Sequence, residues 1–129
     1  MNKLDILLSC YSAGLPEFSD GEQTLIGTPD RTIGPGAICT SHADYIASRE
    51  NGVVCGFFCS DNPCDMENLA EGHDFAVIDG RFIVDTWLFN WECRIDSPVL
   101  DMHDSAHQAI IAQWYGNSAK WVTRSPRAV

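Results

Sequence analysis

Three residues in the middle of the chain, Cys39, His73 and Asp85, have the side-chain types of a nucleophile, a base and an orienting acid. A thiol becomes a good nucleophile when a base takes its proton, and a carboxylate bound to the other imidazole nitrogen keeps that base oriented. The stretch GHDFAVIDGRFIVDTW predicts a β-hairpin that turns at Asp79-Gly80. One strand begins with His73 and the other ends with Asp85, so the pairing of the strands decides whether the two side chains meet.

Two registers of this hairpin are compatible with the sequence. A two-residue loop at Asp79-Gly80 would direct His73 and Asp85 to opposite faces of the sheet. A three-residue loop at 78–80, with Gly80 in the left-handed conformation, would place them directly opposite each other. Their Cβ atoms would then be about 5 Å apart, and the free imidazole nitrogen could act as a base.

Cys39 is the best candidate for the nucleophile because it follows a Gly-Pro-Gly turn and opens a predicted helix. A helix N-terminus favours a thiolate and offers backbone N–H groups that can hold an oxyanion. Ser41 and Asp44 resemble a capping box, which would start the helix after Cys39. His42 competes as the base, but a histidine on the same helix seldom reaches the face that substrate approaches, so we expect His73.

The chain order of these residues and the pattern HDFAVIDGRFIVDTW resemble the papain-like and transglutaminase-like superfamily of cysteine hydrolases over residues 34–90. The resemblance implies a papain-like core, with Cys39, His73 and Asp85 as a catalytic triad. It also implies a peptide or protein substrate and a peptidase, amidase, acyltransferase or deamidase activity. A short chain without a signal peptide suits the deamidase toxins and effectors best.

The substrate-binding residues are predicted less directly. Papain-like peptidases often carry a glutamine shortly before the cysteine to complete the oxyanion hole, and Ile33 stands at that position here. Gln23 lies further back and is the candidate substitute. Trp87 follows Asp85 closely and is expected to wall the site and shield the histidine–aspartate bond from water.

The surrounding elements predict a single α+β domain over residues 1–129, with a mostly antiparallel sheet. Apolar spacing, turn residues and caps predict the following elements: helices at 3–13, 39–50 and 106–115, the last capped by Asp104 or Ser105; strands at 53–60, in the 73–89 hairpin, at 91–95 and at 120–124; and loops at 14–37 and 61–72.

The charge balance excludes some functions and suggests an alternative one. The chain has 18 acidic and 8 basic residues, a net charge of −10, so it should repel nucleic acid. Five acids lie close together and predict a solvated loop: Asp61, Asp65, Glu67, Glu71 and Asp74. The alternative function is therefore a small acidic binding protein, such as an inhibitor or immunity factor, with a basic protein partner.

Neither a membrane span nor a signal peptide is evident, which predicts a cytoplasmic protein or one secreted without a signal peptide. The six cysteines are expected to be free thiols, with Cys55 and Cys59 facing the core. His103 and His107 are expected at the surface, so no metal or cofactor is predicted. Structural roles for the triad residues also remain open: Cys39 as a small buried hydrophobe, His73 at the surface and Asp85 as a strand cap.

Overall fold

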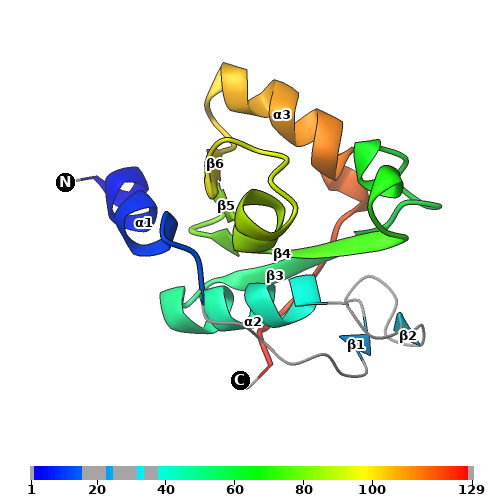
Figure 1. Cartoon of the computed structure of the whole chain (residues 1–129), viewed down its shortest axis with the longest axis horizontal. Helices are drawn as coiled ribbons and strands as arrows, with labels where there is room; N and C mark the ends of the chain where they lie inside the picture. The colour runs from blue at the N-terminus through cyan, green and yellow to red at the C-terminus, as the bar shows by residue number, and fades with distance from the viewer. Residues whose placement is uncertain (1, 16–22, 25–31, 34–37, 128–129) are drawn as a thin grey trace.

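The computed structural model describes residues 2–15, 23–24, 32–33 and 38–127. It is an α+β fold, as predicted, in which helices flank a sheet (Figure 1). The elements run in this order: α1 (Lys3–Tyr11), β1 (Gln23–Thr24), β2 (Thr32–Ile33), α2 (Ile38–Glu50), β3 (Val53–Phe58), η1 (Asp65–Asn68), β4 (Gly72–Ile78), β5 (Phe82–Val84), η2 (Trp87–Trp91), β6 (Val99–Asp101), α3 (Ser105–Tyr115), η3 (Ser118–Lys120) and β7 (Val122–Arg124).

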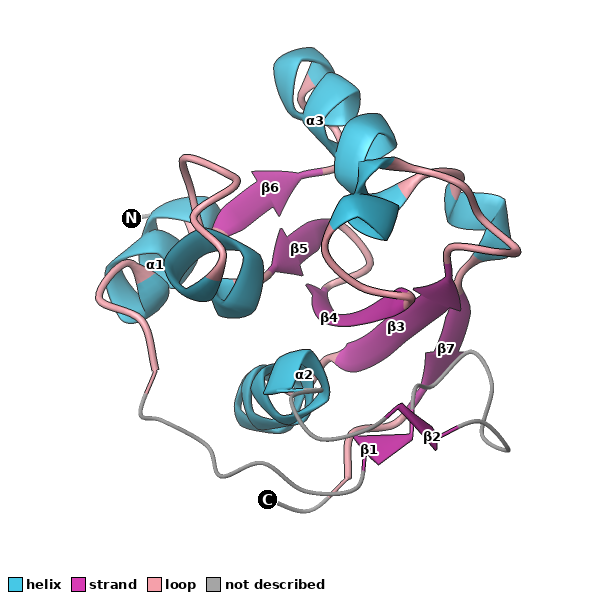
Figure 2. Cartoon of the chain, turned by 45° about the vertical axis from the view of Figure 1, so that its right-hand side comes forward, coloured by secondary structure: helices cyan, strands magenta, loops and turns pink. Residues whose placement is uncertain are grey.

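The main sheet has five antiparallel strands in the order β6-β5-β4-β3-β7, and β1 pairs with β2 separately. The strands β3 and β4 form its centre, and β4 is buried along its whole length. α2 lies on one side of this sheet and α3 on the other (Figure 2). The predicted last strand is confirmed, because β7 pairs with β3 and forms one edge of the sheet.

Two hydrophobic clusters cover the two faces of the sheet, and the alternation of β4 supplies both. Phe75 and Val77 belong to the cluster that includes Trp87 and Tyr115. Ala76 and Ile78 belong to the other cluster, together with residues of α1 and α2. Neighbouring side chains of a strand point to opposite faces, so one strand anchors both layers.

α2 begins at Ile38, so Cys39 lies inside its first turn. The prediction that a Ser41–Asp44 capping box starts the helix later is wrong. The Asp44 carboxylate instead accepts from the backbone N–H of Arg127 at 3.0 Å and pairs with Arg124 at 2.8 Å. The predicted stop is confirmed: Asn51 adopts a φ of 56°, a left-handed conformation common after helices.

The hairpin between β4 and β5 uses neither predicted register. Ile78 pairs with Phe82, and the loop consists of the three residues 79–81. Asp79 and Gly80 have φ values of 56° and 62°, and the N–H of Arg81 donates to the carbonyl of Ile78. Positive φ at both central positions characterises a type I′ turn, which suits the twist of the strands. The register differs from the predicted three-residue alternative by an even number of residues, so side-chain faces are preserved.

The predicted strand at 91–95 is also wrong. Residues Trp87–Trp91 form a π-helical turn, η2, in which the N–H of Glu92 donates to the carbonyl of Trp87. The sheet continues with β6 instead, which pairs with β5. Single π turns are rare and occur often at functional sites.

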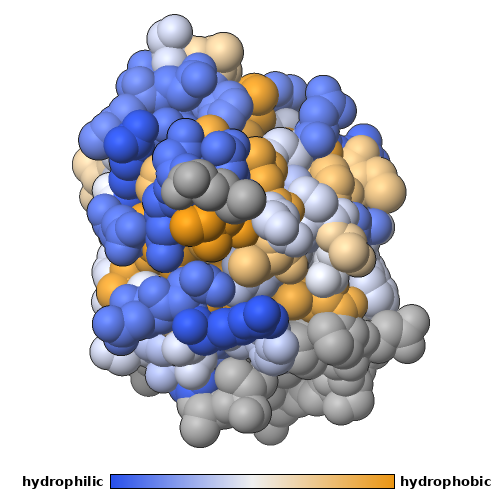
Figure 3. Space-filling view, turned by 90° about the vertical axis from the view of Figure 1, so that its left-hand side faces the viewer, coloured by the Kyte–Doolittle hydropathy of each residue, from blue (hydrophilic) through white to orange (hydrophobic). Residues whose placement is uncertain are grey.

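The face that carries α1 combines hydrophilic surface with a smaller area of hydrophobic residues (Figure 3). Ile6 of α1 is 41% exposed and Trp91 of η2 is 51% exposed. Within the described ranges no helix is both long and apolar enough to cross a lipid bilayer.

Candidate catalytic site

The side chains of His73 and Asp85 meet in the interior of the protein. His73 lies near the start of β4, and Asp85 directly follows β5. The Nε2–H of His73 donates to Oδ2 of Asp85 at 2.5 Å, and the two side chains are 0% and 2% exposed. If the β4–β5 pairing continued past the end of β5, His73 would lie opposite position 87. Asp85 is two residues from that position, so the side chains of His73 and Asp85 are diagonal neighbours on the same face of the sheet. The structure therefore brings the predicted pair together through a register that the sequence did not indicate.

Asp85 is held from several sides. Its Oδ1 accepts from the backbone N–H of Leu88 at 2.9 Å, and its Oδ2 also accepts from the hydroxyl of Tyr115 at 2.7 Å. Its own backbone N–H donates to the carbonyl of Pro98. A buried carboxylate is tolerated only when such donors replace water. Asp85 therefore does more than cap the end of a strand.

Cys39 is 3% exposed and belongs to the hydrophobic cluster on the histidine side of the sheet. The buried residues Ala43, Ile46 and Ala47, later in the same helix, belong to the other cluster. The first turn of α2 therefore lies where the two clusters meet. Together with Asp85, which has the larger effect, the Cys39 thiol is close enough to contribute to the raised pKa of His73.

The second ring nitrogen of His73, Nδ1, is buried and has no partner with full hydrogen-bond geometry among the described residues. Catalytic hydrogen bonds are often loose before substrate binds, so a nearby thiol that is not yet aligned fits a nucleophile–base pair. The predicted surface position of a structural His73 is wrong, because the ring is fully buried.

Aromatic rings enclose the imidazole. The ring centroid of Trp87 lies 4.8 Å from that of His73, and the centroids of Phe75 and Tyr115 both lie 5.8 Å away. Trp87 is 5% exposed and its ring lies beside the imidazole, while its role as a wall of the substrate site stays a prediction. These rings exclude water and so strengthen the histidine–aspartate interaction.

Two further hydrogen bonds tie α2 to the hairpin. The hydroxyl of Thr40 donates to Oδ2 of Asp74 at 2.7 Å, and both residues are buried. Nδ1 of His42 lies 2.6 Å from Oγ1 of Thr86. These four residues are the immediate neighbours of the triad or lie one helical turn away.

The buried Asp74 is not part of the predicted solvated acidic loop. The other four acids of that prediction are exposed: Asp61, Asp65, Glu67 and Glu71.

Burial and charge shift the pKa values of His73 and Asp85 in opposite directions. Burial alone would lower the pKa of His73, but the charge and hydrogen bond of Asp85, with Cys39, raise it above its usual range. Burial would raise the pKa of Asp85, but His73, Tyr115 and the Leu88 N–H lower it. Burial lowers the pKa of His42 to about 4, outweighing Asp85, so this second histidine is neutral.

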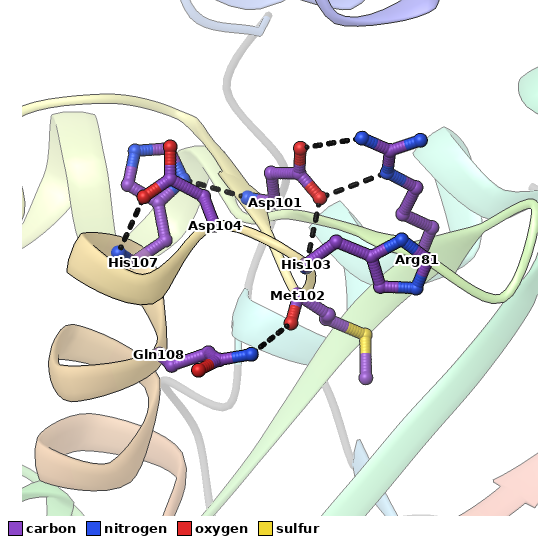
Figure 4. A network of polar contacts seen from close by, with 7 residues as sticks. All are labelled: Arg81, Asp101, Met102, His103, Asp104, His107 and Gln108. Carbon is purple, nitrogen blue, oxygen red and sulfur yellow. Dashed lines mark hydrogen bonds and ion pairs between the residues drawn. The ribbon is translucent and has the colours of Figure 1, made fainter.

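The opposite end of the hairpin holds a second polar network (Figure 4). Arg81 donates from Nε and Nη2 to both oxygens of Asp101, each at 2.9 Å. The Asp101 backbone N–H donates to Nδ1 of His107, and the His103 N–H donates to Oδ1 of Asp101. His103 precedes α3, so the two histidines do not share a helix face.

The remaining sequence predictions concern other residues. The backbone of Gln23 lies in β1, which contacts α2, but its side chain lies outside the described residues, so its substrate-binding role stays a prediction. Cys55 and Cys59 are buried in the core as predicted. Within the part of the chain that the structure describes, no cluster of three or more potential ligands could hold a metal ion.

Sequence reasoning missed Tyr115 and Leu88 as partners of Asp85. Tyr115 lies 30 positions from Asp85, and a buried tyrosine at a helix end carries no local signal for such a contact. The Leu88 N–H is available because η2 begins at Trp87, two residues after Asp85.

No protein-family model, curated protein or solved structure matches this chain. No comparison therefore assigns a role to the residues of the candidate site.

Proposed function

We propose that the protein is a cysteine-dependent hydrolase of peptide or carboxamide bonds, with Cys39, His73 and Asp85 as its catalytic triad. The observation that carries the proposal is the fully buried His73, whose Nε2 binds Asp85 while Nδ1 is left without an aligned partner. The resemblance to the papain-like superfamily supports the same assignment.

In the proposed reaction, the thiol proton of Cys39 moves to Nδ1 of His73, and Sγ attacks the carbonyl carbon of the substrate. His73 then gives this proton to the leaving amine, and the broken C–N bond leaves a thioester on Sγ. A water molecule that loses a proton to His73 hydrolyses the thioester and regenerates the thiol. With glutamine as the substrate, the products are glutamate and ammonia.

The raised pKa of His73 suits this role because an imidazole that holds its proton strongly can take it from a neighbouring thiol. Asp85 stabilises the resulting imidazolium and fixes the ring through Nε2. A purely structural histidine would be expected to use both nitrogens in hydrogen bonds, as buried polar groups usually do.

The test is the pH dependence of thiol alkylation. Sub-stoichiometric iodoacetamide is mapped by mass spectrometry over all six cysteines, in wild type, in His73→Ala and in the matched control His103→Ala. We expect Cys39 to react first at about pH 6 in wild type and in the control, and to lose this preference without His73. A Cys39 that reacts no faster than the other thiols would refute the proposal.

An acidic binding protein is the second candidate, supported by four exposed acids between β3 and β4. The four acidic residues are Asp61, Asp65, Glu67 and Glu71. An unreactive Cys39, combined with stoichiometric, salt-sensitive binding of a basic protein, would favour this candidate.

A further inference from the structure

Two of the buried nitrogen atoms that lack a hydrogen-bond partner among the described residues belong to neighbouring rings. They are Nδ1 of His73 and Nε1 of Trp87, whose rings have centroids 4.8 Å apart. A buried donor without a partner has lost its hydrogen bonds to water and gained none in return, so native proteins seldom leave one without a reason. The proposed proton transfer accounts for Nδ1 but leaves the indole N–H unexplained.

The backbone fixes where this indole lies. Continuing the β4–β5 register beyond β5 would place Trp87 opposite His73. η2 begins at Trp87, and the N–H of Glu92 donates to its carbonyl in the π-helical pattern. The ring is 5% exposed and belongs to the same hydrophobic cluster as Cys39. The Trp87 ring, which carries an unpaired N–H donor, thus lies beside the base and in the cluster that contains the thiol.

We propose that the indole N–H of Trp87 donates a hydrogen bond to the carbonyl oxygen of the substrate and to the oxyanion that forms on it. This inference rests on the proposed hydrolase function. When Sγ of Cys39 bonds to the carbonyl carbon, the carbonyl π electrons move to oxygen, and a donor in a dry site stabilises that charge strongly. The first turn of α2 supplies backbone N–H groups as additional donors.

This role differs from shielding, for which the aromatic ring alone would be sufficient. A test must therefore remove the N–H and keep the ring. Replacing Trp87 with β-(3-benzothienyl)alanine changes the ring N–H to sulfur and preserves the bicyclic shape. The same replacement at Trp91, which is 51% exposed, is the matched control.

Two reactions of the same thiol separate the possibilities. p-Nitrophenyl acetate acylates Cys39 through a tetrahedral oxyanion: the S–C bond forms, the C–O bond to p-nitrophenolate breaks, and a thioester remains. Iodoacetamide alkylates the same sulfur by direct displacement of iodide, with no oxyanion. We expect the benzothienyl variant to lower the acylation rate about 10²-fold and to leave alkylation within about twofold.

The ratio of the two rates is the readout, and Trp87→Phe provides a second variant with the same expected fall in that ratio. An unchanged ratio of the two rates in both variants would overturn the assignment. An equal slowing of both reactions is one such result, and it would show that Trp87 affects the reactivity of the thiol and not the oxyanion. A wild-type Cys39 without preferential alkylation would be a different result, because it would refute the hydrolase function and not only the oxyanion donor.

Discussion

The two ends of the β4–β5 hairpin each hold a carboxylate bound to a basic side chain, and each has two of the four histidines nearby. At the open end, His73 and Asp85 are 0% and 2% exposed. At the turn end, Arg81 and Asp101 are 44% and 11% exposed. Paired charges alone therefore do not distinguish a catalytic site from a structural one.

The ends differ in what remains unpaired. Arg81 holds both oxygens of Asp101, whose backbone N–H is bound by His107. Arg81 lowers the pKa of Asp101 to about 2, so this carboxylate is a permanent acceptor. At the buried end, Nδ1 of His73 has no aligned partner and lies near a thiol. We propose that this unpaired nitrogen in a dry environment makes the buried end, and not the turn end, suitable for catalysis.

The largest effect should come from removing the base at the buried end. We expect His73→Ala to lower the rate of Cys39 acylation by p-nitrophenyl acetate at least about 10³-fold, because neither proton transfer nor the imidazolium remains. Stopped-flow release of p-nitrophenolate measures this rate. A loss below about tenfold would show that the two ends of the hairpin do not differ in the way proposed.

The second prediction concerns acid stability and His42. The folded-state pKa of about 4 lies below its ordinary 6.5, so the unfolded chain binds this proton first as the pH falls. The stability from neutral His42 is therefore full above about pH 6.5 and is lost as the pH falls through 4, by up to about 3 kcal/mol. Urea unfolding at several pH values should show this fall in the free energy of unfolding with decreasing pH, a slope against pH, in wild type and in His103→Ala. His42→Gln should reduce it, and an unchanged slope would assign it to other groups.

A smaller effect is expected at the third partner of the aspartate. Tyr115→Phe removes the hydroxyl that donates to Oδ2 of Asp85 but keeps the ring beside Phe75. Asp85 then bonds more strongly to His73, so the pKa of His73 should rise. At a given pH a smaller fraction of His73 is then in the neutral form that can accept the thiol proton, so acylation should slow about tenfold. The pH–rate profile should shift to higher pH. A slower rate with an unshifted profile would indicate only a packing defect.

The smallest effect is expected at the turn end. Arg81→Ala breaks the ion pair with Asp101, which is partly exposed to water. Exposed pairs contribute little, and this one lies away from the reacting groups, so acylation should stay within about twofold of wild type. A large loss of activity in Arg81→Ala would show that the turn sets the register at the buried end.

The parts of the fold that depend on local signals could be predicted from the sequence. Asp104 caps α3 by accepting from the N–H groups of Ala106 and His107, and Asn51 ends α2. Apolar spacing placed Leu7 and Tyr11 on the buried side of α1. These signals act within one or two helical turns, where side chain and backbone determine each other directly.

The exact pairing at the candidate site could not be predicted. The alternation of apolar and polar residues in the hairpin determines the face of the sheet on which His73 lies. A shift of the strand pairing by two residues leaves every side chain on the same face but gives it a different partner on the neighbouring strand. The contact of Tyr115 with Asp85 depends on how α3 packs, and η2 replaces a strand that local propensity favoured. Such features come from tertiary packing, which a single sequence does not encode locally.

The π-helical turn at Trp87–Trp91 makes the candidate site depend on a residue count as well as on residue types. The hydrogen bond of a π turn joins residues five apart, whereas that of an α turn joins residues four apart. Deleting one residue from 88–91 would therefore rotate the turn and change the direction of the residues that precede it. The Leu88 N–H and the Trp87 ring would both move relative to Asp85 and His73. Substitution scanning of these positions would not detect this dependence, whereas a single in-frame deletion would.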